Sequence, residues 1–138
     1  MKTFLLFLSL IILNSCANFT QKSIVIHHLD GQFQLIELNG KDVSSKDFIF
    51  NFLPAENRVF GETGCNGFSA NFKQQDENFG FIDPLSTKKF CDGKMETENK
   101  ILNALLETKS FKMKENEFIF FGEDKEQLFT LKNIQEVE

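Results

Sequence analysis

The chain has 138 residues and a formal net charge of −5, with 18 phenylalanines and neither tryptophan nor tyrosine. This length predicts one domain, and the acidic balance argues against nucleic acid or an anionic membrane surface as an electrostatic partner. The phenylalanines supply ample area for a hydrophobic core.

The first fifteen residues have the features of a secretory signal. Lys2 gives a positive start, residues 4–13 form an apolar run, and Leu13-Asn14-Ser15-Cys16 follows. A spanning helix needs roughly 20 apolar residues, about twice this run. The tetrapeptide resembles a bacterial lipobox, so residues 1–15 are expected to be a lipoprotein signal peptide and Cys16 the lipidated residue. Cleavage before Cys16 without lipidation is the alternative.

Residues 16–31 are expected to be the lipidated N-terminus and a tether, and residues 32–138 the domain. Several acyl chains on one cysteine give stable anchoring to a membrane without crossing it. Ala17 follows the cysteine, which by analogy with lipoprotein sorting in enteric bacteria favours the outer membrane. Residues 23–29 are either an early strand or part of the tether. The predicted location is therefore the cell envelope.

Alternating apolar residues predict a series of strands in the first part of the domain. Phe48, Phe50 and Phe52 fall on one face of such a strand, and Asn39-Gly40 is a strong turn signal after an earlier one. Residues 41–47 are expected to be a loop, and Asp83-Pro84 to end a strand. The predicted strands are 33–38, 48–52, 58–62, 68–73 and 79–82. Their short connections require antiparallel pairing.

One amphipathic helix is predicted at 93–108, with Asp92 as its cap. Its apolar stripe is expected to contain Met95, Ile101, Leu102, Leu105 and Leu106. Further strands are predicted at 111–114, 117–121 and 128–131. Strands followed by one helix and more strands predict an α+β fold, an antiparallel curved sheet or partly open barrel of about six to eight strands packed on one amphipathic helix.

Gly61, Gly64 and Gly67 lie within seven residues of one another, between two of the predicted strands. Because glycine adopts positive φ without steric cost, this spacing predicts a tight corner. Asn66 lies in the same corner, and its amide is expected to bond to neighbouring backbone groups and hold the turn.

Cys65 and Cys91 remain once Cys16 is assigned to the lipid. An even pair in an oxidising compartment predicts a disulfide. Two buried reduced thiols are one alternative. A catalytic Cys65 is another, since backbone amides of a glycine-rich turn could stabilise a thiolate. That chemistry needs a nearby base, and the histidines, His27 and His28, lie near the tether.

The remaining candidates for chemistry have simpler interpretations. His27 and His28 could bind a metal with a cysteine, but adjacent residues on a strand point to opposite faces, so solvated histidines are expected. Glu96 and Glu98 could act as acid and base, but residues two apart on a helix diverge, and helix solubility accounts for them. No catalytic residue, metal or cofactor is predicted.

An ordered set of motifs resembles the META domain family of HslJ-like proteins over residues 32–132. The set is Gly61-x-x-Gly64-Cys65-Asn66-x-Phe68, then Thr87-x-x-x-Cys91, then Glu98 in a leucine-rich helix, then two final strands. The resemblance implies small envelope proteins linked to heat stress and antibiotic tolerance, without an established catalytic activity. It carries over a structural signature alone: Gly61, Gly64, Cys65, Asn66, Phe68, Thr87 and Cys91.

Some residues depart from the family pattern. Phe33 stands where a tryptophan is usual, Ala70 and Phe72 where glycine and tyrosine are common, and Lys89-Phe90 where Met-Ala is usual. These changes exchange packing residues or alter a surface. They leave the expected fold intact and weaken any inference of a shared binding surface.

These features together predict a non-enzymatic envelope lipoprotein in stress response or envelope maintenance, acting by binding an envelope protein or a small apolar ligand. The alternative is an inhibitor of an envelope-directed hydrolase, a lysozyme or a protease, that presents the loop 88–94.

Overall fold

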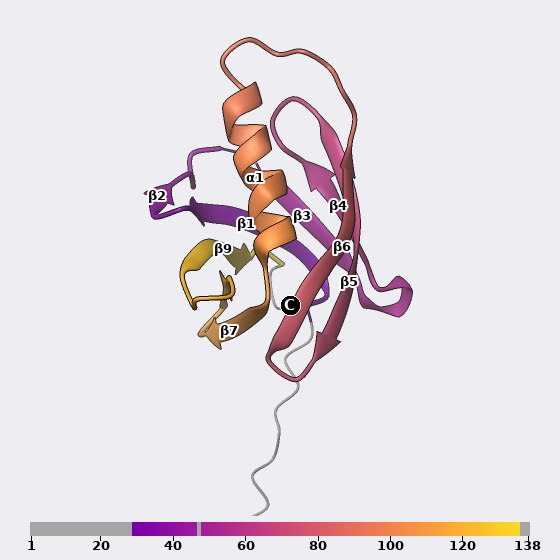
Figure 1. Ribbon diagram of the computed structural model, residues 1–138, viewed down its shortest axis with the longest axis vertical. Coiled ribbons are helices and arrows are strands. Elements are labelled where there is room, and N and C mark those ends of the chain that lie inside the picture. Colours follow the sequence, from indigo (N-terminus) through magenta and orange to yellow (C-terminus); the bar gives the residue numbers. More distant parts are fainter. Residues whose placement is uncertain (1–28, 47, 136–138) are drawn as a thin grey trace, which may run out of the picture.

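Strands dominate the chain in a computed structural model, which describes residues 29–46 and 48–135 (Figure 1). The strands are β1 (Gly31–Leu38), β2 (Lys41–Asp42), β3 (Ile49–Leu53), β4 (Arg58–Glu62), β5 (Gly67–Gln75), β6 (Asn78–Ser86), β7 (Ser110–Lys114), β8 (Glu117–Phe121) and β9 (Gln127–Asn133). The helices are a 3-10 turn at Pro54–Glu56 and α1 (Met95–Glu107). The predicted signal peptide, the lipidation of Cys16, the tether up to residue 28, and His27 and His28 lie outside the described residues.

The strands form one antiparallel sheet in the order β2-β1-β3-β4-β5-β6-β7-β8-β9, and β9 also pairs with β1. The sheet therefore curves until its long outer strands meet (Figure 1). Its thinnest junction is between β6 and β7, where Asn78 opposite Ser110 is the sole paired position. The predicted α+β class with a curved antiparallel sheet is confirmed, but the sheet has nine strands among the described residues instead of the expected six to eight. Lys41–Asp42, expected to be loop, adds a short strand after the Asn39-Gly40 turn.

Phenylalanine rings from most strands fill the space inside the curve. Phe48, Phe50 and Phe52 are all buried, as their alternation predicted. The rings contact one another at edges and in offset stacks, the arrangements that aromatic quadrupoles favour, as between Phe120 and Phe129 with centroids 4.5 Å apart. Helix α1 covers this core and packs mainly against β6 (Figure 1).

The predicted helix is present, but its buried face differs from the predicted stripe. Leu106 is 55% exposed, while the buried positions are Glu98, Ile101, Ala104 and Leu105. Each helical residue advances the direction by about 100°, so Leu106 lies about 140° from Ile101 and Glu98 about 60°. The predicted cap is also wrong, because Lys94 occupies the N-cap position and makes no side-chain capping bond.

The predicted strand end at Asp83-Pro84 is wrong, since β6 continues to Ser86. The register shifts between Ser69 and Asn71 of β5, which marks a bulge on the facing strand, and Asp83 has φ 49°. A bulged residue needs no ladder hydrogen bond, so a proline that lacks an N–H can occupy this position inside a strand.

Candidate functional site

The glycine corner is the loop between β4 and β5, residues 63–66, called the corner loop below. The Thr63 backbone N–H and hydroxyl both donate to the Asn66 carbonyl oxygen, each at a distance of 2.9 Å. Gly64 has φ +85°, and a Cβ there would lie 2.8 Å from the Phe48 ring. The predicted tight turn is thus centred on Gly64, where both conformation and space favour glycine.

The other two glycines of the corner lie on strands. A Cβ on Gly61 of β4 would overlap the Ile49 carbonyl oxygen of β3 and lie 2.8 Å from the Phe68 ring. A Cβ on Gly67 would meet nothing nearer than the Gly61 carbonyl oxygen, at 3.7 Å. Gly61 therefore serves close packing between neighbouring strands, a role that the turn interpretation did not include.

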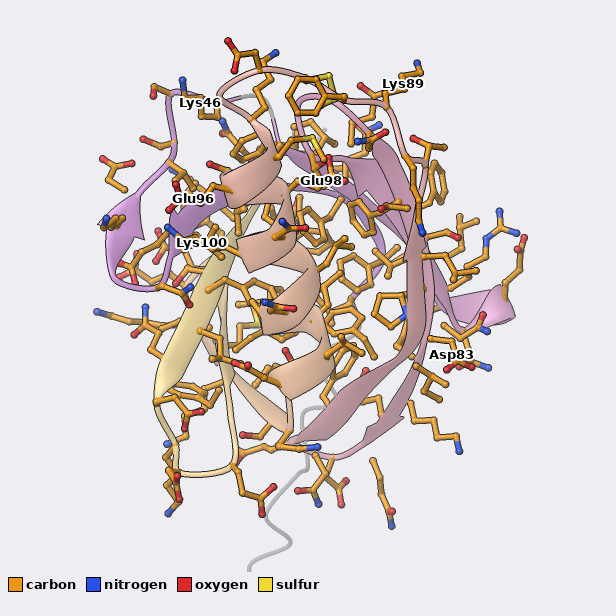
Figure 2. The ribbon with its side chains drawn as sticks, turned by 45° about the horizontal axis from the view of Figure 1, so that its top comes forward. Lys46, Asp83, Lys89, Glu96, Glu98 and Lys100 are labelled. Atoms are coloured by element: carbon orange, nitrogen blue, oxygen red, sulfur yellow. A yellow bond between two sulfur atoms is a disulfide. The ribbon has the colours of Figure 1, made fainter. Side chains whose placement is uncertain are left out.

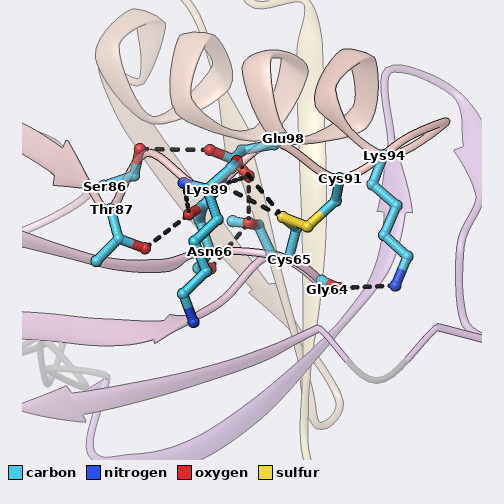
Figure 3. The surroundings of a disulfide bond; sticks show 10 residues. Gly64, Cys65, Asn66, Ser86, Thr87, Lys89, Cys91, Lys94 and Glu98 are labelled. Carbon is cyan, nitrogen blue, oxygen red and sulfur yellow. Dashed lines mark hydrogen bonds between the residues drawn. A yellow bond between two sulfur atoms is a disulfide. The ribbon is translucent and has the colours of Figure 1, made fainter.

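A disulfide bond joins Cys65 of the corner loop to Cys91 (Figure 3). Their Cα atoms are 6.1 Å apart, within the usual range for such bonds, and 26 positions separate them in sequence. This is the predicted pairing, and it leaves neither residue with the free thiol that the reduced-thiol and catalytic-cysteine alternatives require.

The Asn66 side chain connects the corner loop to the segment between β6 and α1. Its Oδ1 accepts from the Thr87 hydroxyl at 2.7 Å and from the Lys89 backbone N–H at 2.8 Å. Its Nδ2 donates to the Lys89 carbonyl oxygen at 3.0 Å and to Glu98 Oε2 at 2.7 Å (Figure 3). The amide was expected to bond within its own turn, but it reaches across to a second loop and to the helix.

Glu98 is buried, with 3% of its surface exposed, so its interpretation as a solubility residue is wrong. Besides Asn66, it accepts from the Ser86 hydroxyl at 3.4 Å and shares the Thr63 hydroxyl proton, from an oxygen 3.2 Å away, with the Asn66 carbonyl oxygen. No salt bridge within the described part of the chain reaches it. The hydrogen-bond donors around this carboxylate are therefore all neutral. Its place in the first turn of α1 is also favourable, because the N-terminal end of a helix dipole is positive.

Glu96 behaves as the sequence predicted and stays on the exposed side of α1, away from Glu98 (Figure 2). It forms an ion pair with Lys100, one helical turn later. The hydrogen bond from Lys100 and its positive charge hold the pKa of Glu96 below its ordinary value.

The segment 87–94, called the disulfide loop below, is held at several points along its length. Thr87 and Lys89 bond to Asn66, Cys91 is bonded to Cys65, and Lys94 Nζ donates to the Gly64 carbonyl oxygen at 2.9 Å. Phe90 nevertheless points outward and is 82% exposed. The corner loop thus fixes the backbone of a loop that presents an apolar ring next to two exposed lysines.

Sequence reasoning identified the glycines, the cysteines and Asn66, but missed Glu98 and Ser86 as parts of the same cluster. A buried carboxylate and an exposed one look alike in a helical segment rich in glutamate. The burial of Glu98 could have been predicted from its position around the helix axis, which is about 60° from Ile101 and close to the buried face.

The part of the chain that the structure describes contains no group of three or more histidine, cysteine, aspartate or glutamate side chains able to hold a metal ion. Within the same residues, no helix combines the length and apolar character needed to span a membrane.

Comparison with known proteins gives a family and a fold. The META domain profile matches residues 26–134. A protein solved by NMR is 24% identical, with a TM-score of 0.59 over 74% of this chain and 87% of the other. A second NMR structure, from Burkholderia xenovorans, is 16% identical, with a TM-score of 0.58 over 77% of this chain and 83% of the other.

A crystal structure of a DUF4847 family protein from Bacteroides vulgatus ATCC 8482 is 13% identical, with a TM-score of 0.57 over 78% of this chain and 95% of the other. At these identities the likeness shows the fold alone. The search of curated proteins gave no match. Because the profile covers well over half of the residues, the chain belongs to the META domain family.

Proposed function

We propose that this chain is a non-enzymatic lipoprotein of the cell envelope, anchored to the outer membrane through Cys16, that acts in stress response or envelope maintenance by binding another protein. The contact surface is the disulfide loop. The signal-like N-terminus and lipobox support the location, and the geometry of the loop supports the mode of action.

The observation that carries the proposal is the combination of a fixed loop backbone with an exposed apolar ring at Phe90, 82% of whose surface faces solvent. Large aromatic side chains are frequent anchors of protein interfaces. A loop already held in one conformation loses little entropy on binding, which favours affinity. The proposed partner therefore has a pocket for an aromatic side chain, and the rim of that pocket is polar or acidic, so that it can lie beside Lys88 and Lys89.

The direction of the strands supports this use of the loop. Gly31, at the start of β1, pairs with Phe52 near the end of β3, whereas the corner loop follows the opposite end of the neighbouring β4. A tether from Cys16 would therefore join the domain at the end remote from the corner and disulfide loops (Figure 1). In this arrangement the disulfide loop faces away from the lipid surface.

The packed interior favours a protein partner over the small apolar ligand that the sequence also suggested. The gap between α1 and the sheet, among Leu35, Phe50 and Leu105, has no space for a water molecule. Ligand pockets usually have volumes of about 300–1,000 Å³. The proposal for a ligand inside the fold is therefore replaced by one for a partner outside it.

The test uses a deletion strain complemented with the full chain or with single variants. After heat stress we expect the wild type and the control Leu106→Ser to restore growth and Phe90→Ser to fail, with equal amounts of protein in the membrane fraction. Leu106 is a matched control because it is also exposed and apolar but lies on α1. A strain without a heat phenotype, or full rescue by Phe90→Ser, contradicts the proposal. The anchor is tested separately by the mass of the mature N-terminus in wild type and Cys16→Ser.

The second candidate is an inhibitor of an envelope-directed hydrolase, a lysozyme or a protease. The disulfide-held loop favours it, because a loop that binds an active site without rearrangement is a common feature of tight inhibitors. Inhibition of purified lysozymes and proteases by the wild type, and its loss in Phe90→Ser, would support this candidate. Absence of inhibition across both enzyme classes would remove it.

A further inference from the structure

A hollow of about 690 Å³ lies on the outer face of the β5–β6 hairpin. Asn71, Lys73 and Gln75 alternate outward along β5, and Lys73 lies opposite Gly80 of β6. This part of the hairpin is remote from the corner and disulfide loops, which adjoin Gly67 and Ser86 at its other end. The hollow is thus separate from the site described above.

The floor of the hollow exists because Gly80 has no side chain. A Cβ at this position would meet the Thr108 carbonyl oxygen at 3.6 Å, an ordinary contact, and Gly80 is not among the glycines with positive φ. Neither packing nor backbone conformation requires glycine at this point. Its effect is to leave a shallow surface that a ligand could contact.

Asn57 and Lys109 form the two sides of the hollow, and a backbone hydrogen bond fixes each of them to the hairpin. The Phe72 N–H donates to the Asn57 carbonyl oxygen at 2.8 Å beside β5, and the Phe79 N–H donates to the Lys109 carbonyl oxygen at 2.9 Å beside β6. Asn57 and Lys109 are therefore separated by three interstrand steps, about 14 Å across the strands, and by two residues, about 7 Å, along them, because Phe72 lies opposite Phe81. This width suits a short oligomer.

The lining is rich in carboxamides and carries positive charge. Asn57, Asn71, Gln75 and Asn78 are exposed, and each side chain can donate and accept hydrogen bonds. Glu56 is paired with Arg58 at 3.4 Å, whereas Lys73 and Lys109 form no ion pair with any described residue.

We infer that this hollow binds a short oligosaccharide that carries a carboxylate. Sugar hydroxyls both donate and accept, as the carboxamides do, and Gly80 with the half-buried Ile82 offers an apolar surface to ring C–H groups. Lys73 and Lys109 would bind the carboxylate. An extended peptide would need an open strand edge, which β5 does not offer because it is paired on both sides. The edge of β6 pairs with β7 only at Asn78, so the test below includes a peptide.

This inference depends on neither the lipid anchor nor the disulfide loop. Its test is a titration of the ¹⁵N-labelled full chain, in a detergent without a sugar headgroup, with the disaccharide of N-acetylglucosamine and N-acetylmuramic acid. Since every contact is solvated, we expect a weak complex with a Kd on the order of 1 mM. Chemical shifts should change at Lys73, Gly80 and Lys109. The neutral disaccharide chitobiose should bind at least about threefold more weakly than the acidic one.

Two variants separate the hollow from the rest of the surface. Gly80→Leu should fill the floor and abolish the shifts, and Lys73→Gln should weaken binding about threefold. Lys132→Gln is the matched control, because Lys132 is exposed on β9 outside the hollow. Dispersed amide spectra of each variant establish folding.

Absence of shifts at millimolar disaccharide overturns the inference, and so does unchanged binding by Gly80→Leu. Equal binding of chitobiose and the acidic disaccharide contradicts the part that assigns the carboxylate to the lysines. Shifts in the same residues with an extended tetrapeptide, but not with the disaccharide, identify a peptide site instead and also overturn it.

Discussion

A buried amide and a buried carboxylate meet where the corner loop faces α1, with Asn66 Nδ2 2.7 Å from Glu98 Oε2. An ionised carboxylate removed from water needs hydrogen-bond donors or a cation to offset its lost hydration. Here Asn66, Thr63 and Ser86 supply the donors. The same amide also binds the backbone of the disulfide loop, so the order of that loop depends on the Asn66–Glu98 contact.

Asn66→Asp is expected to destabilise the fold strongly. The change keeps the shape of the side chain but replaces the donor facing Glu98 with a second carboxylate oxygen. Leaving a buried group without its hydrogen-bond partner costs about 1–3 kcal/mol, and more when the group is charged, so a loss of about 3 kcal/mol is expected. Urea unfolding at neutral pH, with the disulfide intact, measures the loss as a lower midpoint at unchanged slope.

The matched control for this substitution is Asn116→Asp in the exposed turn between β7 and β8. It makes the same chemical change without a buried neighbour, and surface substitutions usually stay within about 0.5 kcal/mol. If the two variants unfold at the same urea concentration, the amide and the carboxylate do not interact as described.

Single residues of this cluster differed in how well the sequence could predict them. Asn66 stood out because it lies between glycines, where amide side chains commonly bond to the backbone. Its actual partners, Lys89 and Glu98, are 23 and 32 positions away, and no local pattern gives contacts at that distance. The donors to Glu98 likewise lie outside its own segment, in the corner loop and at the end of β6.

At the scale of elements, alternation predicted the strands because apolar residues, mostly phenylalanines, fill one face of most of them. The predictions were wrong at positions where a contact between strands overrides the local preference of the residue. Pro84 was expected to end β6, but a bulge opposite Ala70 accommodates it. Gly61 was assigned to a turn, but it lies inside β4 and allows β3 to approach. Pairing between strands, which a single segment does not encode, decided both positions.

Gly61→Ala is expected to cost about 3 kcal/mol, because its Cβ would overlap the Ile49 carbonyl oxygen and the strands would have to separate. Gly67→Ala, on the facing strand of the same hairpin, places its Cβ 3.7 Å from the Gly61 carbonyl oxygen and should change stability by less than about 0.5 kcal/mol. Thermal unfolding of both variants gives the comparison. Equal Tm values would show that close approach of β3 and β4 does not require glycine.

On α1, the Glu96–Lys100 pair predicts a small pH dependence with a definite sign. Lys100 lowers the pKa of Glu96 from its ordinary value of 4.5, so folding favours the ionised carboxylate. The stabilisation is therefore present above pH 4.5 and is lost as pH falls through the lower, folded pKa. In a plot of Tm against pH, Glu96→Gln should lie slightly below the wild type at pH 7 and approach it in acid.

The control for the helix pair is Glu123→Gln, an exposed position between β8 and β9 without an ion pair among the described residues. Its Tm difference from the wild type should stay nearly constant over the same pH range. A difference for Glu96→Gln that grows as pH falls would have the wrong sign for this pair.

For the molecule as a whole, the class of fold followed from the order of strands and helix, but the pairing of β9 with β1 did not. These strands are about a hundred residues apart in sequence, and their contact follows from the accumulated curvature of all the strands between them. The disulfide is another long-range connection, and the cysteine count predicted it without any geometry.

The double variant Cys65→Ala/Cys91→Ala is expected to unfold at a lower urea concentration, with a loss of about 3.5 kcal/mol for a closed loop of 26 residues. The bond acts mainly by restricting the unfolded chain, so the folded structure should persist. Asn66 and Lys94 still connect the two loops, and circular dichroism should be unchanged. Dithiothreitol should shift the wild type toward the double variant and leave the double variant unaffected. If reduction does not move the wild-type midpoint, the hydrogen bonds of the corner alone hold the disulfide loop, and its fixed conformation does not depend on an oxidising compartment.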